Sequence, residues 1–369
     1  MHKTSAWPLA LLYVGLVLYA SLYPFDGWRD QGISPWFFIT APLPKYWTGV
    51  DVGINIVGYA PLGFLFALSA LRTRRDRAPV LAATLAACLL SLGMETLQSF
   101  LPVRVPSNVD WGLNTAGALL GAVTASLLER FGAIDRWSRF RARWFVADAR
   151  GELVLLALWP VALLFPAAVP LGLGQVLERL EAALADALED TPFLDWLPVR
   201  DVELQPLVPS AELLCVLLGV LIPCLLGYCV VRSVWQRAVF APLVVALGLG
   251  AAALSAGLSY GPTHALDWLS LPVHVGLWTG LLLAGALVWL PRRVCAPLVL
   301  LALAVHVSVL NQAPTSAYFA QTLHTWEQGR FIRFQGLVQW LGWLWPYAAM
   351  VVVVGRIARP VSGKTKIPA

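Results

Sequence analysis

Three pairs of polar residues recur at helical spacing close to the ends of apolar runs. They are Glu95 with Gln98, Asp110 with Asn114, and Asp51 with Asn55. A spacing of three or four residues places both members of a pair on one face of a helix. Arg104 lies in the short segment between the first two pairs. Because consecutive helices with short connections pack side by side, we expect these side chains at one end of a bundle.

The chemistry open to this cluster depends on Glu95 and Arg104. An ionisable residue at membrane depth is costly and is usually functional, so Glu95 could act as a general acid or base. The planar guanidinium of Arg104 suits a phosphate or carboxylate, which it can bind through two parallel hydrogen bonds. A structural alternative stays open: Arg104 could pair with Asp110 or Glu95 and hold two helices in register.

The elements that carry these residues are apolar runs of about twenty residues, long enough to cross a bilayer as helices. Hydrophobic residues make up 59% of the 369 residues and charged residues 13%, against ~25% charged residues in a soluble domain. The sequence therefore predicts an all-α polytopic transmembrane bundle of about ten spans, the first of them an uncleaved span and not a signal peptide. The runs lie at 7–23, 52–71, 79–99, 110–128, 153–173, 211–231, 238–257, 271–290, 294–310 and 336–355.

Charge is divided between alternate connections. Arginine and lysine gather after the second, fourth, sixth, eighth and tenth runs, whereas acidic residues gather in the other connections. By the positive-inside rule, both termini are cytoplasmic and the polar cluster lies at the outer face. The net charge of +5 therefore reflects orientation in a membrane, and no nucleic-acid partner is expected.

Small residues predict how closely the spans approach. Gly117 and Gly121 form a Gly-x-x-x-Gly motif that continues the helix face of Asn114. Such faces let two backbones come into contact within lipid.

The basic stretch 129–151 predicts a boundary within the chain. It separates a four-span domain, 1–128, from a six-span domain, 152–369. We expect its arginines to contact anionic lipid head groups at the cytoplasmic surface. In the second domain, the segment 174–210 begins with an amphipathic stretch that is expected to lie on the outer leaflet.

Several motifs occur together between residues 8 and 128. They are Asp51-Val-Gly-Ile-Asn55, Tyr59-Ala-Pro-Leu-Gly63-Phe64, Glu95-Thr-Leu-Gln98, Arg104, Asp110, Asn114-Thr-Ala-Gly117 and Gly121. In combination they resemble the VanZ-like family of integral membrane proteins. The resemblance implies a multi-pass protein of the bacterial inner membrane that is connected with envelope glycans, because the name-giving member is associated with teicoplanin resistance and relatives accompany exopolysaccharide genes. Asn55 replaces the histidine of the family's Asp-x-x-x-His, which argues against a titrating imidazole at this position.

We therefore expect the first domain to bind a lipid-linked or cell-envelope glycan, such as a polyprenyl phosphate, in an outward-facing polar cavity. Glu95 is the candidate acid or base, and the expected binding residues are Asn55, Gln98, Arg104, Asp110 and Asn114. Whether the protein is an enzyme stays open, and a transporter component and a non-catalytic scaffold are the alternatives. No nucleotide-binding motif is present and no cofactor is expected.

A looser polar set lies in the second domain, in outer connections and at outer ends of spans. It consists of His264, Asp267, His274, His306 and His324. Because no tight motif such as His-Glu-x-x-His is present, we interpret these as isolated interfacial histidines and expect no metal site.

Overall fold

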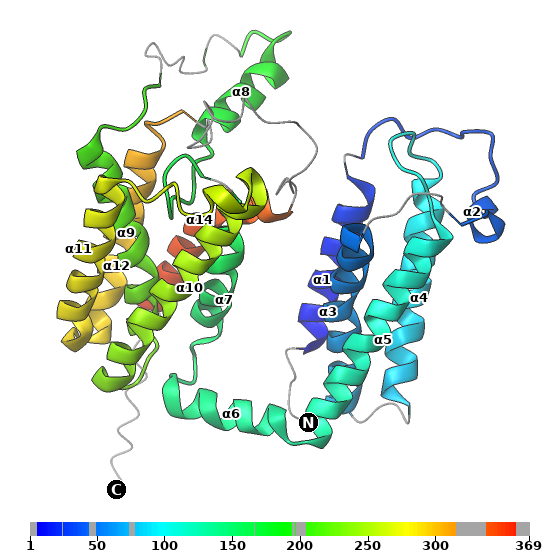
Figure 1. The fold of residues 1–369 in the computed structure, drawn as a ribbon, viewed down its shortest axis with the longest axis horizontal. Helices are drawn as coiled ribbons and strands as arrows, with labels where there is room; N and C mark the ends of the chain where they lie inside the picture. The colour runs from blue at the N-terminus through cyan, green and yellow to red at the C-terminus, as the bar shows by residue number, and fades with distance from the viewer. Residues whose placement is uncertain are drawn as a thin grey trace, which may run out of the picture. The chain divides into compact units, whose positions relative to one another are not determined.

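The computed structural model describes residues 6–23, 25–43, 49–73, 78–165, 167–193, 196, 204–314 and 337–358. Within these ranges the regular structure is helical, and a single isolated β-bridge joins Phe145 to Val231. The chain divides into two compact units, residues 1–140 and 141–369, which can be followed by colour in Figure 1.

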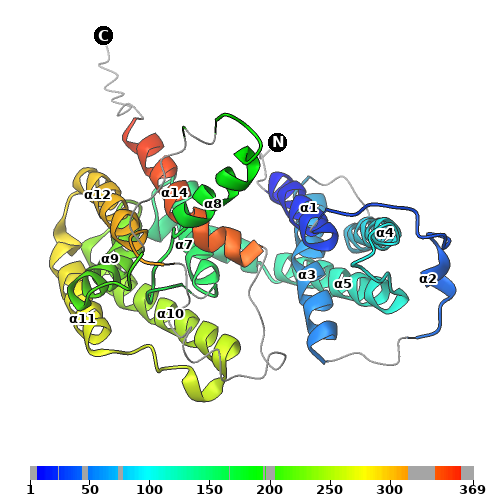
Figure 2. The ribbon, with the colours of Figure 1, turned by 90° about the horizontal axis from the view of Figure 1, so that it is seen from above.

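The first unit is a bundle of four long helices. It contains α1 (Ala6–Leu22), α2 (Phe37–Thr40), α3 (Gly49–Thr73), α4 (Pro79–Gln98), α5 (Asn108–Arg130) and the first part of α6 (Ala133–Trp144). Helix α3 packs against α1, α4 and α5, as seen from above in Figure 2. The core between them is made of fully buried apolar side chains such as Leu62, Leu101 and Ala118.

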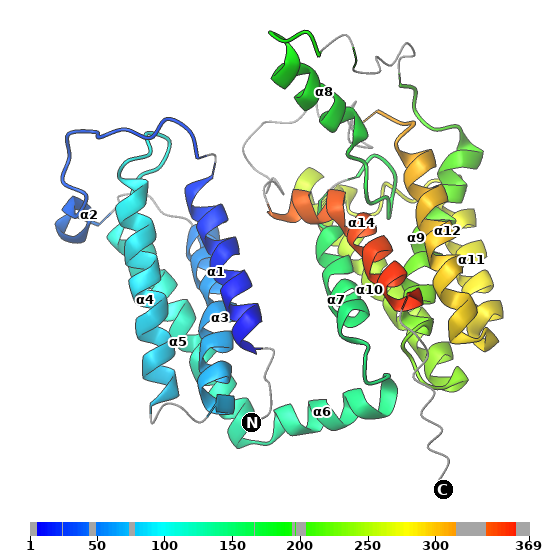
Figure 3. The same ribbon diagram turned by 180° about the vertical axis from the view of Figure 1, so that it is seen from behind.

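The second unit is built around α9. Its elements are α7 (Arg150–Ala162), α8 (Leu177–Leu188), α9 (Pro209–Tyr228), α10 (Val234–Tyr260), η2 (Pro262–His264), α11 (Leu271–Ala286), η3 (Leu287–Trp289), α12 (Arg292–Leu310) and α14 (Leu337–Ile357). Helix α9 packs against α7, α10, α11 and α12 and is buried over most of its length. Figure 3 shows α8 beyond the end of this bundle.

Length and composition fit a membrane protein. Among the described residues, eight helices are long and apolar enough to cross a bilayer: α3, α4, α5, α9, α10, α11 with η3, α12 and α14. Helix α1 is apolar but shorter, with 17 residues. The prediction of an all-α polytopic bundle is confirmed, whereas the cytoplasmic location of both termini stays a prediction.

The expected span 153–173 is not a continuous helix. Helix α7 ends at Ala162, and the described residues from 163 to 176 contain no further helix. The local sequence explains why no helix resumes before α8: Pro170, Gly172 and Gly174 lie in this stretch, and each disfavours helix. Hydropathy alone does not register these residues as interruptions because their neighbours are apolar.

Two side-chain hydrogen bonds tie the loop after α1 to the bundle. Gln31 donates to the Ser99 carbonyl at 2.7 Å, and Asn108 donates to the Ala41 carbonyl at 2.8 Å. In α8, the leucines at 177, 180 and 184 are exposed, so the described residues of the unit leave this side of the amphipathic helix open.

Arginines at one end of the second unit bind carbonyl groups at helix termini. The buried Arg237 donates to the carbonyl oxygens of Tyr228, Val288 and Leu290. Carbonyl groups at the C-terminal end of a helix have no partner within that helix, and a cation complements the partial negative charge there.

Candidate functional site

The polar cluster lies on α3, α4 and α5, and glycines set the distance between α3 and α5. A Cβ atom added to Gly117 or Gly121 of α5 would lie 2.3 Å from the Ile56 carbonyl oxygen or 1.8 Å from that of Ala60. A Cβ on Gly63 of α3 would meet the α5 backbone in the same way, at 1.9 Å. The two backbones are therefore in contact, and the close approach predicted from the Gly-x-x-x-Gly spacing is confirmed.

Glu95 lies in the last turn of α4 and is 4% exposed. Its Oε2 accepts a hydrogen bond from the backbone N–H of Ser107 at 2.8 Å. Ser107 is the N-cap of α5, and its own hydroxyl accepts from the N–H groups of Val109 and Asp110. The carboxylate thus completes the cap of the next helix by satisfying a donor that the helix itself cannot.

No cation pairs with Glu95 among the described residues. The ion pairs found among the described residues of the first unit join Arg72 to Glu129 and to Asp135, far along the chain from the cluster. The carboxylate of Asp110 is near enough to Glu95 to repel it. A buried carboxyl group held by a backbone N–H and by no basic side chain is chemically suited to bind or release a proton.

Asn55 and Asp110 form a direct link between α3 and α5. The Asn55 amide donates from Nδ2 to Oδ1 of Asp110 at 2.8 Å, and Asp51, one turn earlier on α3, interacts electrostatically with the same carboxylate. A neutral amide positions Asp110 without neutralising it. This is the structural effect of having Asn55 where an imidazole could become cationic.

The cluster extends inward to a buried polar pair. Asn114 donates from Nδ2 to the Ser91 hydroxyl at 3.0 Å. The other amide atom, Oδ1, and the hydroxyl of Tyr59 are buried and make no hydrogen bond of good geometry within the described chain. The Tyr59 hydroxyl nevertheless lies beside Ser91 and Ser21 and interacts electrostatically with Glu95. Buried polar atoms without full partners are exceptions in native proteins and call for an explanation.

Gln98 and Arg104 both bind the end of α1. Gln98 donates from Nε2 to the Ser21 carbonyl at 2.9 Å. Arg104 donates to the carbonyls of Ala20 and Tyr23 at 3.2 and 2.8 Å. Together the two side chains satisfy the final carbonyl groups of α1 and connect it to the loop between α4 and α5.

The pairing of Arg104 with Glu95 or Asp110, which opposite charge suggested, is therefore wrong. Carbonyls at a helix C-terminus lack partners and carry partial negative charge, so they compete with carboxylates for a nearby guanidinium. Both carbonyl bonds of Arg104 are made by the same terminal nitrogen. Since a guanidinium has five N–H groups, Arg104 retains donors for an anionic group.

Three residues of the site were absent from the expected set: Tyr59, Ser91 and Ser107. Two of them carried a usable signal in their spacing. Ser91 precedes Glu95 by four residues and Tyr59 follows Asn55 by four, which places each on the polar face of its helix. Ser107 carried a capping signal, because serine just before an apolar run marks a helix start.

The histidines of the second unit do not form a common site. His264 bonds through Nδ1 to Asp267 at 2.5 Å, and the buried His306 accepts from the Leu173 N–H at 3.4 Å, while His274 is exposed on α11. No three potential metal ligands gather anywhere in the described ranges. His324 lies outside them.

The fold and the site define a class: the chain is a multi-pass α-helical membrane protein with a buried polar cluster on three closely packed helices. The comparisons then add a family, because residues 6–129 match the family model described as VanZ/LLP1. This match supports a VanZ-like assignment for the segment that contains the whole cluster. No curated protein and no solved structure matches the chain.

Proposed function

We propose that the first unit binds the head group of a lipid-linked or cell-envelope glycan, such as a polyprenyl phosphate, in the bacterial inner membrane. In this role the protein serves envelope polysaccharide biogenesis or resistance to glycopeptides. The binding residues are Asn55, Gln98, Arg104, Asp110 and Asn114, with Glu95 as the acid or base. The VanZ-like assignment supports the link to envelope glycans, since the family resemblance implies it.

The observation that carries this proposal is the environment of the Glu95 carboxyl group. A carboxyl group that is 4% exposed and bonded to the Ser107 N–H, with no basic partner among the described residues, is costly to keep in a membrane domain. A purely structural cap needs no charge, because a serine or asparagine oxygen accepts from an N–H equally well. The neighbouring polar atoms of Tyr59 and Asn114 offer contacts to hydroxyl groups of a sugar.

Arg104 supplies the complementary charge at the edge of the cluster. It is half-buried, and its carbonyl bonds occupy one terminal nitrogen. Its remaining N–H groups suit a phosphate oxygen.

The alternative is a non-catalytic scaffold or transporter component, and one observation favours it. Glu95, Gln98 and Arg104 each satisfy a helix terminus, at α5 or α1. Side chains used in this way hold three helices, α1, α4 and α5, in register whether or not a ligand is present.

Native mass spectrometry of the purified protein with a polyprenyl phosphate separates these functions. We expect Arg104→Gln to raise the dissociation constant about tenfold, the effect of losing one hydrogen bond to a charged group. Arg29→Gln is the matched control, because Arg29 is an exposed arginine of the loop that follows α1. Equal binding by the two variants, or none by the parent protein, would contradict the proposal.

A second comparison tests the role of Glu95. Glu95→Gln keeps a carbonyl oxygen for the Ser107 N–H but cannot release a proton. If Glu95 acts as an acid or base, the variant binds the lipid and loses the envelope phenotype in cells. A scaffold predicts that Glu95→Gln retains it.

A further inference from the structure

The break after α7 is an unusual feature for a chain in a bilayer. The 13 residues of α7 extend about 20 Å, against roughly 30 Å for the hydrocarbon layer. After a final turn at residues 163–165, residues 167–176 are not helical, and all those from 171 to 175 are buried. Non-helical backbone at membrane depth is tolerated where protein encloses it or where it lines a cavity.

Side chains from three other helices or their ends satisfy this backbone. Ser255 of α10 donates to the Leu164 carbonyl at 2.7 Å, and His306 of α12 accepts from the Leu173 N–H at 3.4 Å. The Gly174 carbonyl accepts from Asn311 and Tyr347 at 3.0 and 3.1 Å, and the Val176 and Leu177 N–H groups donate to Asn311 Oδ1. Because several side chains hydrogen-bond to this non-helical backbone, the break is a stable part of the fold.

The backbone inside the break is held in an uncommon conformation. Leu171 has a φ of 60°, which is rare for a residue with a side chain, and Gly174 has a φ of 96°. Gly219 of α9 makes room for Leu171, since a Cβ there would lie 2.8 Å from the Leu171 Cβ. Strained backbone that its surroundings fix this firmly is found most often at functional sites.

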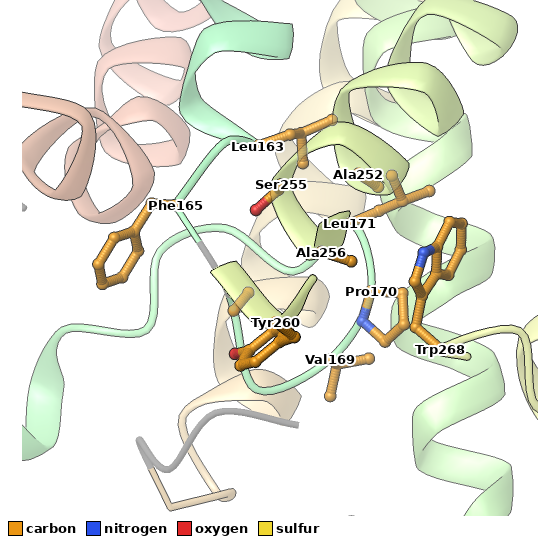
Figure 4. A pocket seen from close by; sticks show the side chains of 11 residues that line it. Leu163, Phe165, Val169, Pro170, Leu171, Ala252, Ser255, Ala256, Tyr260 and Trp268 are labelled. Carbon is orange, nitrogen blue, oxygen red and sulfur yellow. The ribbon is translucent and has the colours of Figure 1, made fainter. Parts of the chain in front are cut away.

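Two cavities flank the break. The larger, of about 50 Å³, is drawn in Figure 4. Its lining is apolar and aromatic, with Leu171 and Val169 from the break, Ala252 and Tyr260 from α10, and Trp268 from the loop before α11. A cavity of this size and lining admits part of a hydrocarbon chain and not a whole lipid.

The second cavity is smaller and more polar. It measures about 20 Å³ and is lined by Gly172, Gly174, Gln175, Arg179 and Trp343, among others. The Arg179 guanidinium stacks on the Trp343 ring at 5.0 Å from its centroid. Stacking holds the plane of the guanidinium in place while its N–H edge remains free to meet an anion.

The two cavities belong to one stretch of chain, because Phe165 and Ala167 line both. An apolar cavity and an oriented arginine thus border the same short segment. The ligand that fits both is an amphiphile with an anionic head, and a bilayer supplies such molecules to any cavity that faces it.

We propose that this break is a second binding site, specific for an anionic phospholipid, whose chain enters the apolar cavity while its phosphate binds Arg179. The site is independent of the cluster around Glu95 and does not rest on its function. It assigns a role to the second unit, for which the family match supplies none.

The test uses the whole protein in detergent and native mass spectrometry, with phosphatidylglycerol, phosphatidylcholine and inorganic phosphate as probes. The parent protein is expected to retain phosphatidylglycerol about tenfold better than phosphatidylcholine, and Arg179→Gln should remove this preference. Arg293→Gln, at an exposed arginine where α12 begins, is the control and should keep it.

A cavity-filling variant tests the position of the chain. Ala252→Leu places three more carbons in the apolar cavity and should weaken retention of phosphatidylglycerol, whereas Ala286→Leu, on an exposed face of α11, should not. Thermal unfolding of each variant shows whether it is folded. If Ala252→Leu does not fold, Arg179→Gln still tests the proposal, because Arg179 is exposed and its replacement should leave the fold intact. Equal retention by Arg179→Gln and Arg293→Gln overturns the proposal. Displacement of the lipid by inorganic phosphate at similar concentration also overturns it, since the site would then recognise a free anion.

Discussion

The Glu95 carboxylate at the end of α4 accepts the backbone N–H of Ser107, the N-cap of α5, at 2.8 Å. This bond closes the turn between two spans across eleven intervening residues of loop and helix end. Among the described residues, the hydrogen-bond donor to Glu95 is thus a backbone N–H, which no mutation can move without moving the helix. The consequences for stability and for proton chemistry can therefore be separated by choice of substitution.

Glu95→Ala should lower the free energy of unfolding by about 1–3 kcal/mol, because it leaves the half-buried N–H of Ser107 without an acceptor. Glu95→Gln keeps an oxygen in the same place and should stay within about 1 kcal/mol of the parent protein. Denaturant unfolding of the purified protein in detergent measures both. An alanine variant as stable as the parent would show that the bond contributes nothing.

The contact between α3 and α5 should tolerate no added atom. Gly121→Ala brings a Cβ to 1.8 Å from the Ala60 carbonyl oxygen, which forces the helices apart and should cost about 1–3 kcal/mol or more. Gly112→Ala in the same helix is the control, since nothing lies within 4 Å of its Cβ. There alanine should be neutral or stabilise the helix by up to ~1 kcal/mol. Similar unfolding midpoints for the two variants would contradict the packing described above.

These contrasts show which parts of the structure could be predicted from sequence. Apolar runs locate the helices because a helix must be long and apolar enough to cross the hydrocarbon layer. Gly117 and Gly121 predicted the helix contact, and helical spacing placed Asn55 and Asp110 on helices that meet. In each case the information is local and periodic, so a single sequence is enough.

The partners of Arg104 could not be predicted in the same way. Its position in a loop with prolines does not fix the direction of the side chain. The carbonyl groups at the end of α1 that lack partners within the helix cannot be recognised from residue types. The break after Ala162 was missed for a different reason. Its stabilisation comes from Ser255, His306 and Asn311, which lie about 90 to 150 residues further along the chain and carry no local signal.

The hydroxyl of Tyr59 can be tested by removing it alone. Tyr59→Phe deletes a buried oxygen that lacks a hydrogen bond of good geometry, so the free energy of unfolding should stay the same or rise slightly. If the hydroxyl contacts the ligand, lipid binding should fall about fivefold to tenfold at unchanged stability. The two measurements together distinguish this from a structural role, in which stability and binding would fall together.

The contact between Glu152 and Arg356 should behave as a coupled pair that joins α7 to α14. The Glu152 side chain is 4% exposed and that of Arg356 18%, and Arg356 also lies 3.8 Å from the carboxylate of Asp148. Arg356→Met leaves the Glu152 charge poorly solvated and should cost about 3 kcal/mol, at the lower end for a buried pair because Arg356 is partly exposed. Glu152→Gln should cost less, because Arg356 keeps Asp148. The double variant should lose clearly less than the sum of the two. An additive double variant would show that the side chains do not interact.

The orientation predicted from the arginines can be tested by labelling cysteines in intact cells. Val105, between α4 and α5, is 85% exposed, and Trp137, on the arginine-rich α6, is 58% exposed. The native background is low, because four of the five native cysteines are buried and Cys88 is half-buried. If positive charge marks the cytoplasmic side, a membrane-impermeant maleimide should label Val105→Cys in intact cells and Trp137→Cys only after permeabilisation. The reverse pattern would invert the bundle and move Glu95 and Arg104 to the cytoplasmic face, where a lipid-linked glycan exposed on the outer leaflet could not reach them.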